Sequence, residues 1–347
     1  MRSTRFTRLG PCIARRPGGE LSGFLQEENV RYGPIAGVPM SVSRVIQGTM
    51  MLSSEALDAS FALLDEVIEN GGNAFDCAHV YGGGDAERVL GAWIEARGVR
   101  DKVVIVDKGA HPNADRKRVT PYDIASDLHD SLARLRTDRI DLYLLHRDDP
   151  DAPLDEIVDA LNQHAEAGRI SAYGVSNWSH ERIVEANTYA AEHGLRPLAA
   201  SSPHFSLAEQ VVDPWGGCVT LTGQRGRLAR EWYAQAGLPV LAWSSLCHGF
   251  LSGRYSRADI EAFPDDCEEG FLRWYRCATN LTRLERAFVL AREKGATVPQ
   301  VATAYLMHQP VDVFALVGSS LPGEFAANAH ALDIDLTPEE VAFLEGC

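Results

Sequence analysis

Four titratable side chains lie in or at the ends of three apolar segments, and together they could transfer a proton. Asp76 and Tyr81 lie in the first segment, Lys108 ends the second, and His146 ends the third. Because Lys and Asp are rarely buried unless they are paired, a salt bridge between Asp76 and Lys108 would explain two of the four. It would not explain Tyr81 and His146, which are residue types that serve in acid–base catalysis.

The chemistry expected of this set centres on the hydroxyl of Tyr81. An isolated tyrosine has a pKa near ~10 and is a weak acid at neutral pH. A neighbouring ammonium favours the tyrosinate, so Lys108 is expected to lower this pKa. Asp76 would hold Lys108 charged and in place, and His146 would hydrogen-bond the substrate oxygen and orient it.

The segments that carry these residues belong to an alternating series of strands and helices. Eight short apolar or β-branched runs are predicted to be strands, at 44–50, 73–81, 102–108, 141–146, 170–177, 198–204, 239–245 and 313–320. The amphipathic stretches between them often begin at Ser or Thr and end at Gly, as helices do. Strands that alternate with helices form a parallel sheet, and eight such units favour a closed (β/α)8 TIM barrel of the α/β class. The alternative, a Rossmann-type fold, lacks a Gly-x-Gly-x-x-Gly after the first strand.

A single barrel domain over residues 22–347 is expected to account for most of the chain. Residues 1–21 are expected to be a disordered tail, since 1–19 contain five arginines and no acidic residue. The same composition is typical of an organellar transit peptide, but we favour a tail or an over-called start codon.

Three further segments are expected around the barrel. Residues 22–42 are expected to cap its bottom. Residues 253–278 are predicted to form a long loop after the seventh strand, which is either a lid over the barrel mouth or a packed surface excursion. Residues 336–346 are predicted to form a final helix that begins with a capping box.

Composition excludes several classes of protein. The 347 residues carry a formal net charge of −15, which argues against a nucleic acid or an anionic membrane as partner. No apolar run approaches the ~20 residues that a membrane-spanning helix needs. The 7 cysteines are scattered and form no Cys-x-x-Cys pair, which favours reduced thiols in the cytoplasm over disulfides or a zinc site.

From about residue 44 to 346, the chain resembles the aldo-keto reductase family. FDCAHVYGGGDAERVLGAWI is similar to the family's second-strand motif, VDKGA supplies its lysine, IDLYLLHRDD its histidine and GRISAYGVSNW its fifth-strand motif. LAWSSLCHGFLSGRY is similar to its seventh strand, and VGSSLPGEFAANAHAL to its cofactor-clamp segment. The resemblance implies reduction of an aldehyde or ketone by a nicotinamide cofactor, NAD(P)H, or the reverse oxidation. Tyr81 would then be the general acid, and no metal is implied.

The resemblance also implies that the cofactor lies extended across the barrel mouth. Ser176 and Asn177 would hold the carboxamide, and Trp243 would stack on the nicotinamide ring. Gly48 and Thr49 would lie beside the cofactor. The remaining cofactor contacts that it implies are Ser244, Leu246, Gly318, Ser319, Glu324 and Asn328.

The substrate side of the site is less well defined by the sequence. His79 and Trp178 are rim residues for which substrate contact and a purely structural role are equally supported. Ser202 stands where the family usually has a glutamine that contacts the nicotinamide, so that contact would be lost or made through water. The aromatic residues of the 253–278 loop and Trp178 would suit stacking on a sugar ring or an aryl group. Of these we favour a hydroxylated carbonyl such as a sugar, and the oligomeric state is not indicated.

The clamp segment departs from the family pattern in its charge. Residues 318–347 contain no Lys or Arg, and Glu324 stands where the family often has an arginine. A 2′-phosphate prefers a basic partner, whereas a carboxylate can accept a hydrogen bond from a free 2′-hydroxyl. We therefore expect NAD(H) to bind in preference to NADP(H). Three arginines near the seventh strand could reverse this preference: Arg225, Arg227 and Arg254.

Three other functions remain open at this point. A cofactor-binding regulatory protein of the same fold would lack physiological turnover. A different barrel enzyme could form a Schiff base on Lys108. An NAD-retaining lyase or epimerase would take up a hydride and return it.

Overall fold

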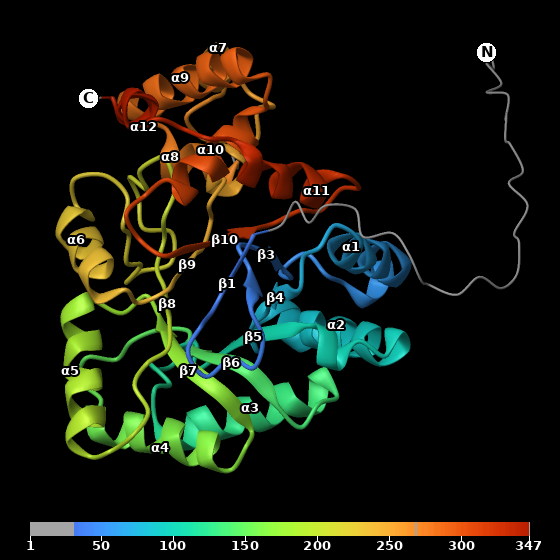
Figure 1. Cartoon of the computed structure of the whole chain (residues 1–347), viewed down its shortest axis with the longest axis vertical. Coiled ribbons are helices and arrows are strands. Elements are labelled where there is room, and N and C mark those ends of the chain that lie inside the picture. The colour runs from blue at the N-terminus through green and yellow to red at the C-terminus, as the bar shows by residue number, and fades with distance from the viewer. Residues whose placement is uncertain (1–30, 268, 347) are drawn as a thin grey trace, which may run out of the picture.

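A closed barrel of parallel strands forms the centre of the computed structural model, which describes residues 31–267 and 269–346 (Figure 1). Around the barrel the strands follow the order β10 (Val313–Val317), β3 (Val45–Gly48), β4 (Ala74–Asp76), β5 (Val104–Gly109), β6 (Ile140–Leu145), β7 (Ile170–Ser176), β8 (Ser201–Ser202) and β9 (Val240–Ala242). Closure comes from the pairing of β9 with β10. All eight predicted strands are present, so the (β/α)8 prediction is confirmed and the Rossmann-type alternative is wrong. The predicted tail, residues 1–21, lies outside the described residues.

Helices follow the strands and surround the barrel (Figure 1). The first six crossovers contain α1 (Leu57–Glu69), α2 (Asp85–Arg97), α3 (Pro121–Leu135), α4 (Leu154–Glu166), α5 (His180–Glu192) and α6 (Arg227–Ala236). Helix α3 begins after Thr120, whose side chain caps it by accepting a hydrogen bond from the backbone N–H of Asp123. In α2, a Cβ atom at Gly91 would lie 2.6 Å from the backbone oxygen of Arg134, so only glycine permits this approach of α3. Short 3₁₀ turns are η1 (Ser54–Ala56), η2 (Tyr81–Gly84), η3 (Arg100–Lys102), η4 (Cys247–Gly249) and η5 (His330–Asp333).

The barrel is filled by side chains and closed at its bottom by the segment that precedes β3. Ahead of the barrel lies an antiparallel pair of strands, β1 (Tyr32–Gly33) and β2 (Val42–Ser43). Ile35, from the connection between them, is buried in one cluster with Ile46, Leu142 and Phe314 of the barrel interior. Residues 31–42 therefore form the bottom cap expected of 22–42, whose first nine residues lie outside the description.

The crossover from β9 to β10 is the longest and contains α7 (Arg257–Ala262), α8 (Gly270–Tyr275), α9 (Ala278–Lys294) and α10 (Val298–Met307). Phe271 and Tyr275 of the predicted loop are buried, and the Tyr275 hydroxyl lies 3.0 Å from His204 Nε2. The described residues of 253–278 therefore pack as part of the wall, which favours the packed excursion over the lid. After β10 come α11 (Glu324–Ala329) and α12 (Pro338–Glu345), and α12 has the predicted capping box.

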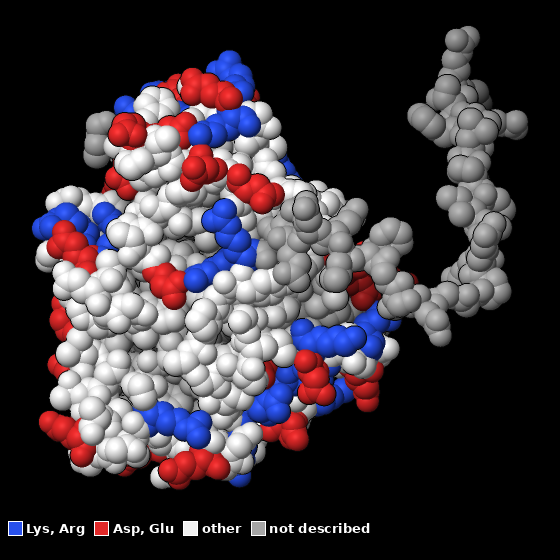
Figure 2. Space-filling view, in the orientation of Figure 1, with Lys and Arg blue, Asp and Glu red and all other residues white. Residues whose placement is uncertain are grey.

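Charged side chains are distributed over the surface with both signs mixed. On the face in Figure 2, the described Lys and Arg side chains lie among Asp and Glu and form no continuous basic patch. No described helix combines the length and the apolar character needed to cross a membrane.

Candidate active site

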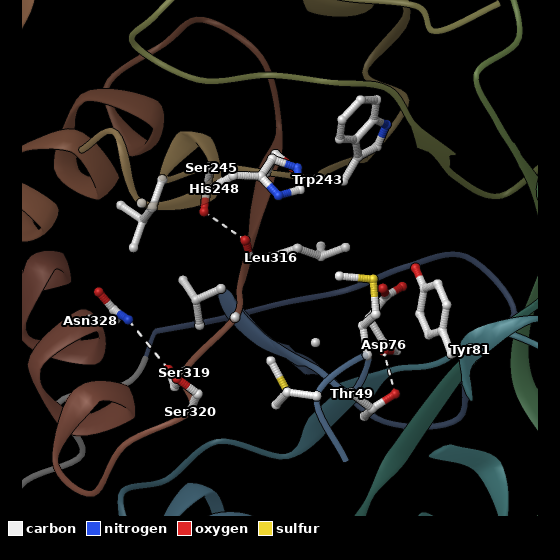
Figure 3. A pocket seen from close by; sticks show the side chains of 18 of the residues that line it. Thr49, Asp76, Tyr81, Trp243, Ser245, His248, Leu316, Ser319, Ser320 and Asn328 are labelled. Atoms are coloured by element: carbon white, nitrogen blue, oxygen red, sulfur yellow. Dashed lines mark hydrogen bonds between the residues drawn. The ribbon is translucent and has the colours of Figure 1, made fainter. Parts of the chain in front are cut away.

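A cavity of about 700 Å³ opens at the C-terminal ends of the barrel strands. In (β/α)8 enzymes this end of the barrel carries the active site. The cavity contains all four predicted catalytic residues and most of the predicted cofactor residues, several of which appear in Figure 3. The predicted residues in its lining are Gly48, Thr49, Asp76, Tyr81, Lys108, His146, Ser176, Asn177, Trp243, Ser244, Leu246, Gly318, Ser319, Glu324 and Asn328.

Lys108 is the centre of the four predicted catalytic side chains. Its Nζ atom donates hydrogen bonds to Asp76 Oδ2 at 2.7 Å and to the backbone oxygen of Cys77 at 2.9 Å. The Tyr81 hydroxyl lies 3.4 Å from the same Nζ atom. The His146 ring meets the Tyr81 ring edge to face, with centroids 5.9 Å apart. Three strand ends that are distant in sequence, those of β4, β5 and β6, thus place one ammonium, one carboxylate, one phenol and one imidazole within reach of a single small molecule.

Local backbone structure explains how Tyr81 reaches this group. Tyr81 begins the 3₁₀ turn η2, in which Gly82 and Gly83 have φ values of 57° and 63°. Glycine adopts these left-handed conformations without steric cost, so the chain can turn immediately after Tyr81 and enter α2. The backbone N–H of His79 donates to the Lys108 oxygen at 2.8 Å, which ties this segment to the end of β5.

The pKa of Tyr81 differs from the sequence prediction. Burial is the largest influence and raises the pKa of the Tyr81 hydroxyl, while the charge of Lys108 acts to lower it. The net direction is upward, so the prediction that Lys108 lowers this pKa below its usual value was wrong. Lys108 acts in the expected sense but does not outweigh desolvation of the tyrosinate. The hydroxyl is therefore protonated at neutral pH and able to give up a proton.

His146 is held in its neutral form. Burial, followed by the positive charges of Lys108, His111 and Arg147, places the pKa of His146 well below its usual value. A neutral imidazole has one N–H to donate and adds no charge beside the Lys108 ammonium. Its Nδ1 atom is buried and has no hydrogen-bond partner among the described residues.

The other half of the cavity has the room and the polar groups that a dinucleotide would need. A Cβ atom at Gly48 would meet no atom closer than Val317 O at 3.4 Å, and one at Gly318 would meet no atom closer than Met51 Cε at 3.5 Å. The absence of a side chain at these two positions therefore leaves open space in the cavity and is not required to avoid a steric clash with neighbouring residues. The Trp243 side chain lines this half of the cavity, and its Nε1 atom is buried without a partner among the described residues.

Unusual backbone conformations concentrate at the same rim. Among the described residues, six non-glycine residues have positive φ, and all but Arg136 follow barrel strands: Ala110, Asn177, Ser244, Cys247 and His248. Such conformations cost free energy and gather where a site requires a particular placement of side chains. Asn177 shows the result, because its Nδ2 atom donates to Ser176 Oγ at 3.0 Å while its Oδ1 atom accepts from Val219 N at 3.3 Å.

Three predicted residues do not reach the cavity. Ser202 is fully buried and donates its hydroxyl hydrogen to the Leu241 oxygen at 2.8 Å, so it points between strands. Its backbone oxygen instead accepts from Ser176 Oγ at 2.8 Å. Trp178 is buried, and its Nε1 atom donates to the Arg147 oxygen at 3.2 Å. His79 turns toward Asp130, at 3.3 Å from its Oδ2 atom. Because each side chain is engaged elsewhere, we withdraw the expectations of cofactor contact for Ser202 and substrate contact for the other two.

The clamp contains an ion pair that the sequence alone did not reveal. Glu324 Oε2 accepts hydrogen bonds from the backbone N–H groups of Ser320 at 2.8 Å and Leu321 at 3.1 Å. Glu324 Oε1 accepts from Arg254 Nη2 at 2.9 Å. One of the three arginines considered for a 2′-phosphate is therefore in the cavity but already paired with Glu324.

Comparison with known proteins agrees with this fold. The model of the Aldo/keto reductase family matches residues 44–347. The chain belongs to this family. Among its relatives, the "Uncharacterized oxidoreductase YrpG" of Bacillus subtilis is 27% identical, over 91% of this chain and 95% of the relative. An "Aryl-alcohol dehydrogenase [NADP(+)]" of Phanerodontia chrysosporium is 29% identical, over 83% of this chain and 75% of the relative.

Not all aldo/keto reductase relatives are named as enzymes. A protein of Oryza sativa, described as a "Probable voltage-gated potassium channel subunit beta", is 27% identical, over 91% of this chain and 96% of the relative. Family membership therefore supports an oxidoreductase. A more specific function has to be inferred from the residues of the cavity.

The cavity also contains residues that were not predicted from the sequence. They are contributed by strand ends and loops, and include His111, Arg147, Trp215 and His248. Arg147 directly follows His146, a position that could have suggested a place at the rim. Trp215 lies in a loop after β8, where the turn residues of Asp-Pro-Trp-Gly-Gly were the available signal.

Proposed function

We propose that the protein reduces an aldehyde or ketone with a nicotinamide cofactor, or catalyses the reverse oxidation. The observation that carries this proposal is the Tyr81 hydroxyl 3.4 Å from the Lys108 Nζ atom, in a cavity with room for a dinucleotide. The family of the chain supports the same class of reaction.

Each of the four residues has a separate role in this proposal. The cofactor, when bound, supplies a hydride, which carries two electrons to the carbonyl carbon. Tyr81 gives its proton to the carbonyl oxygen, so that an alcohol forms and solvent later restores the proton. Lys108 stabilises the tyrosinate left behind, Asp76 holds Lys108, and neutral His146 donates a hydrogen bond that orients the carbonyl oxygen.

The proposal includes the surroundings of the reaction. Ser176, Asn177 and Trp243 would bind the nicotinamide end, and Ser319 and Asn328 the adenosine end. The five described cysteines are free thiols, which supports a reducing compartment such as the cytoplasm. A preference for hydroxylated carbonyls such as sugars stays a prediction from the sequence.

Titration of the purified protein with NADH and NADPH, followed by tryptophan fluorescence, is the first test. Trp243 lines the cavity, so a bound nicotinamide should quench its emission in a saturable way. Turnover is then measured with glyceraldehyde and substituted benzaldehydes as cofactor absorbance falls. Failure of both cofactors to bind, by fluorescence and by calorimetry, would refute the proposal.

The rice relative's name motivates a second candidate, a regulatory protein that binds the cofactor without turnover. Saturable binding without turnover on any carbonyl would favour it. Oxidoreduction that regenerates the starting cofactor in each cycle would instead indicate a lyase or epimerase.

Cofactor choice is expected to depend on Glu324. In the wild-type protein NADH should bind more tightly than NADPH, because Glu324 repels a 2′-phosphate and occupies Arg254. Glu324→Gln removes the repulsion and releases Arg254, so the ratio of the NADPH and NADH dissociation constants should fall by about 10-fold. Glu66→Gln is the matched control, since Glu66 accepts from Gly323 N at 2.9 Å but does not line the cavity. Tighter NADPH binding by the wild-type protein would contradict the prediction.

The pH dependence of the reaction should report Tyr81. Reduction requires the protonated hydroxyl, and burial raises the pKa of Tyr81 above its usual value. We therefore expect kcat/KM for reduction to stay level through neutral pH and to fall only above about pH 10, while the rate of oxidation rises over the same range. His146 adds no inflection near neutrality, because its pKa is lowered. A fall in reduction between pH 6 and 8 would show that another group is the acid.

A further inference from the structure

A second cationic group lies in the cavity beside the four residues described above. The side chain of Arg147, the residue after His146, lines the cavity, and only 8% of Arg147 is exposed. His111 and His146 line the same cavity, and the charge of Arg147 acts to lower the pKa of both imidazoles. Its backbone is held in place by the hydrogen bond from Trp178 Nε1.

Arg147 has no carboxylate partner among the described residues. The other buried cations have one: Lys108 pairs with Asp76 at 2.7 Å, and Arg283 pairs with Glu209 at 3.0 Å. A buried charge is normally paired, because removing it from water is costly. Arg147 therefore departs from the pattern of the rest of the molecule.

The two acidic residues that follow Arg147 in the sequence pair with other cations. Asp148 lies 3.5 Å from Arg182 Nε, and Asp149 lies 2.8 Å from Lys117 Nζ. The hydrogen bond recorded for the Arg147 guanidinium is from Nη1 to Cys218 Sγ, at 3.4 Å. Burial raises the pKa of Cys218 to about 11, so at neutral pH this partner is an uncharged thiol.

An aromatic side chain lies in the same cavity. Trp215 lines the cavity, is 49% exposed, and its ring centroid lies 5.7 Å from that of Trp243. Its place in the loop is fixed by Asp213, whose Oδ1 atom accepts from Trp215 N at 3.1 Å. An exposed indole in a cavity offers stacking to a flat apolar body, whereas a guanidinium fork offers two parallel hydrogen bonds to a carboxylate.

We propose that Arg147 binds a carboxylate of the substrate, so that the preferred substrates are flat carbonyl compounds with a carboxylate remote from the reacting carbonyl. The proposal rests on the reductase function proposed above and names the substrate class of that site. Trp215 stacks on the body of such a molecule, and the carboxylate supplies the charge that Arg147 lacks.

The test compares 4-carboxybenzaldehyde with its neutral methyl ester, methyl 4-formylbenzoate. In the wild-type enzyme kcat/KM for the acid should exceed that for the ester by about 10- to 100-fold, the range expected for hydrogen bonds between charged groups. Arg147→Met should bring this ratio close to one, and Arg147→Lys should give an intermediate ratio because the charge remains and the fork is lost. Lys117→Met is the control: it removes a positive charge near the rim from a residue that pairs with Asp149 and does not line the cavity, so the ratio should stay at the wild-type value.

The two proposals can fail separately. Equal kcat/KM for the acid and the ester in the wild-type enzyme would overturn the carboxylate site while leaving the reductase intact, and this result needs no variant to fold. If Arg147→Met keeps the wild-type ratio of kcat/KM for acid over ester but binds NADH more weakly, Arg147 binds a cofactor phosphate. That result would also overturn the carboxylate site. If neither aldehyde is turned over, fluorescence titration with benzoate and benzamide still tests the site. Binding of benzoate that Arg147→Met abolishes would support the carboxylate site without the reductase, and equal binding of both ligands would refute it.

Discussion

Tyr81→Phe is expected to lower kcat for carbonyl reduction by about 10²- to 10⁴-fold, the usual contribution of a general acid. The substitution removes one oxygen atom from a ring that already fits the cavity, so the position of the ring and the space for the cofactor should be retained. The lost group is the hydroxyl that lies 3.4 Å from Lys108 Nζ. The dissociation constant for the preferred cofactor should therefore change little while turnover collapses.

Tyr143→Phe provides the matched control for this experiment. The Tyr143 hydroxyl is also buried, but it has no hydrogen-bond partner among the described residues and lies in the core outside the cavity. The same chemical change there should leave kcat near its wild-type value. Comparable turnover by Tyr81→Phe and the wild-type enzyme would remove Tyr81 as the proton donor, and Lys108 chemistry would then become the stronger hypothesis.

Lys108→Met is expected to damage both stability and activity. The side chains of Lys108 and Asp76 are 3% and 5% exposed, so the variant leaves a buried carboxylate without its cation. Removing one partner of such a pair typically costs about 3–5 kcal/mol of unfolding free energy. Urea denaturation should show this loss, and turnover should fall by at least about 10²-fold because the tyrosinate loses its stabilising charge.

The double variant Asp76→Asn/Lys108→Met separates the two effects. It removes both charges, so much of the lost stability should return while turnover stays low. If the double variant were as unstable as the sum of the single variants, the two side chains would not act as a pair. If the double variant regained turnover, Lys108 would have no part in the chemistry.

The fold could be predicted from the sequence because its signals are local and repeated. Most barrel strands lie in short apolar or β-branched runs, and the helices between them have amphipathic patterns with recognisable ends. The residues Asp76, Tyr81, Lys108 and His146 stood out because polar groups at the ends of such runs need a reason to be there. The parallel arrangement then requires these ends to meet.

The site predictions that were wrong or missing have physical causes that the sequence does not reveal. Ser202 was assigned to the cofactor, but β8 contains only two residues, and a shift of one position on a strand moves a side chain to the opposite face. The pKa of Tyr81 depends on how far burial outweighs a neighbouring charge, which needs the three-dimensional surroundings. Arg147 could be seen in the sequence, but the lack of a carboxylate partner could not, because it depends on where Asp148 and Asp149 turn.

The loop that carries Trp215 has a consequence for how this protein could change over evolution. Asp213 accepts hydrogen bonds from the backbone N–H groups of Trp215, Gly216 and Cys218, so this short turn is organised largely by its own residues. Replacing it would not disturb the pairing of β8 or the packed interior of the barrel. Substrate choice can therefore diverge by exchange of this one turn, while the proton-transferring residues, held by other strands, are inherited unchanged.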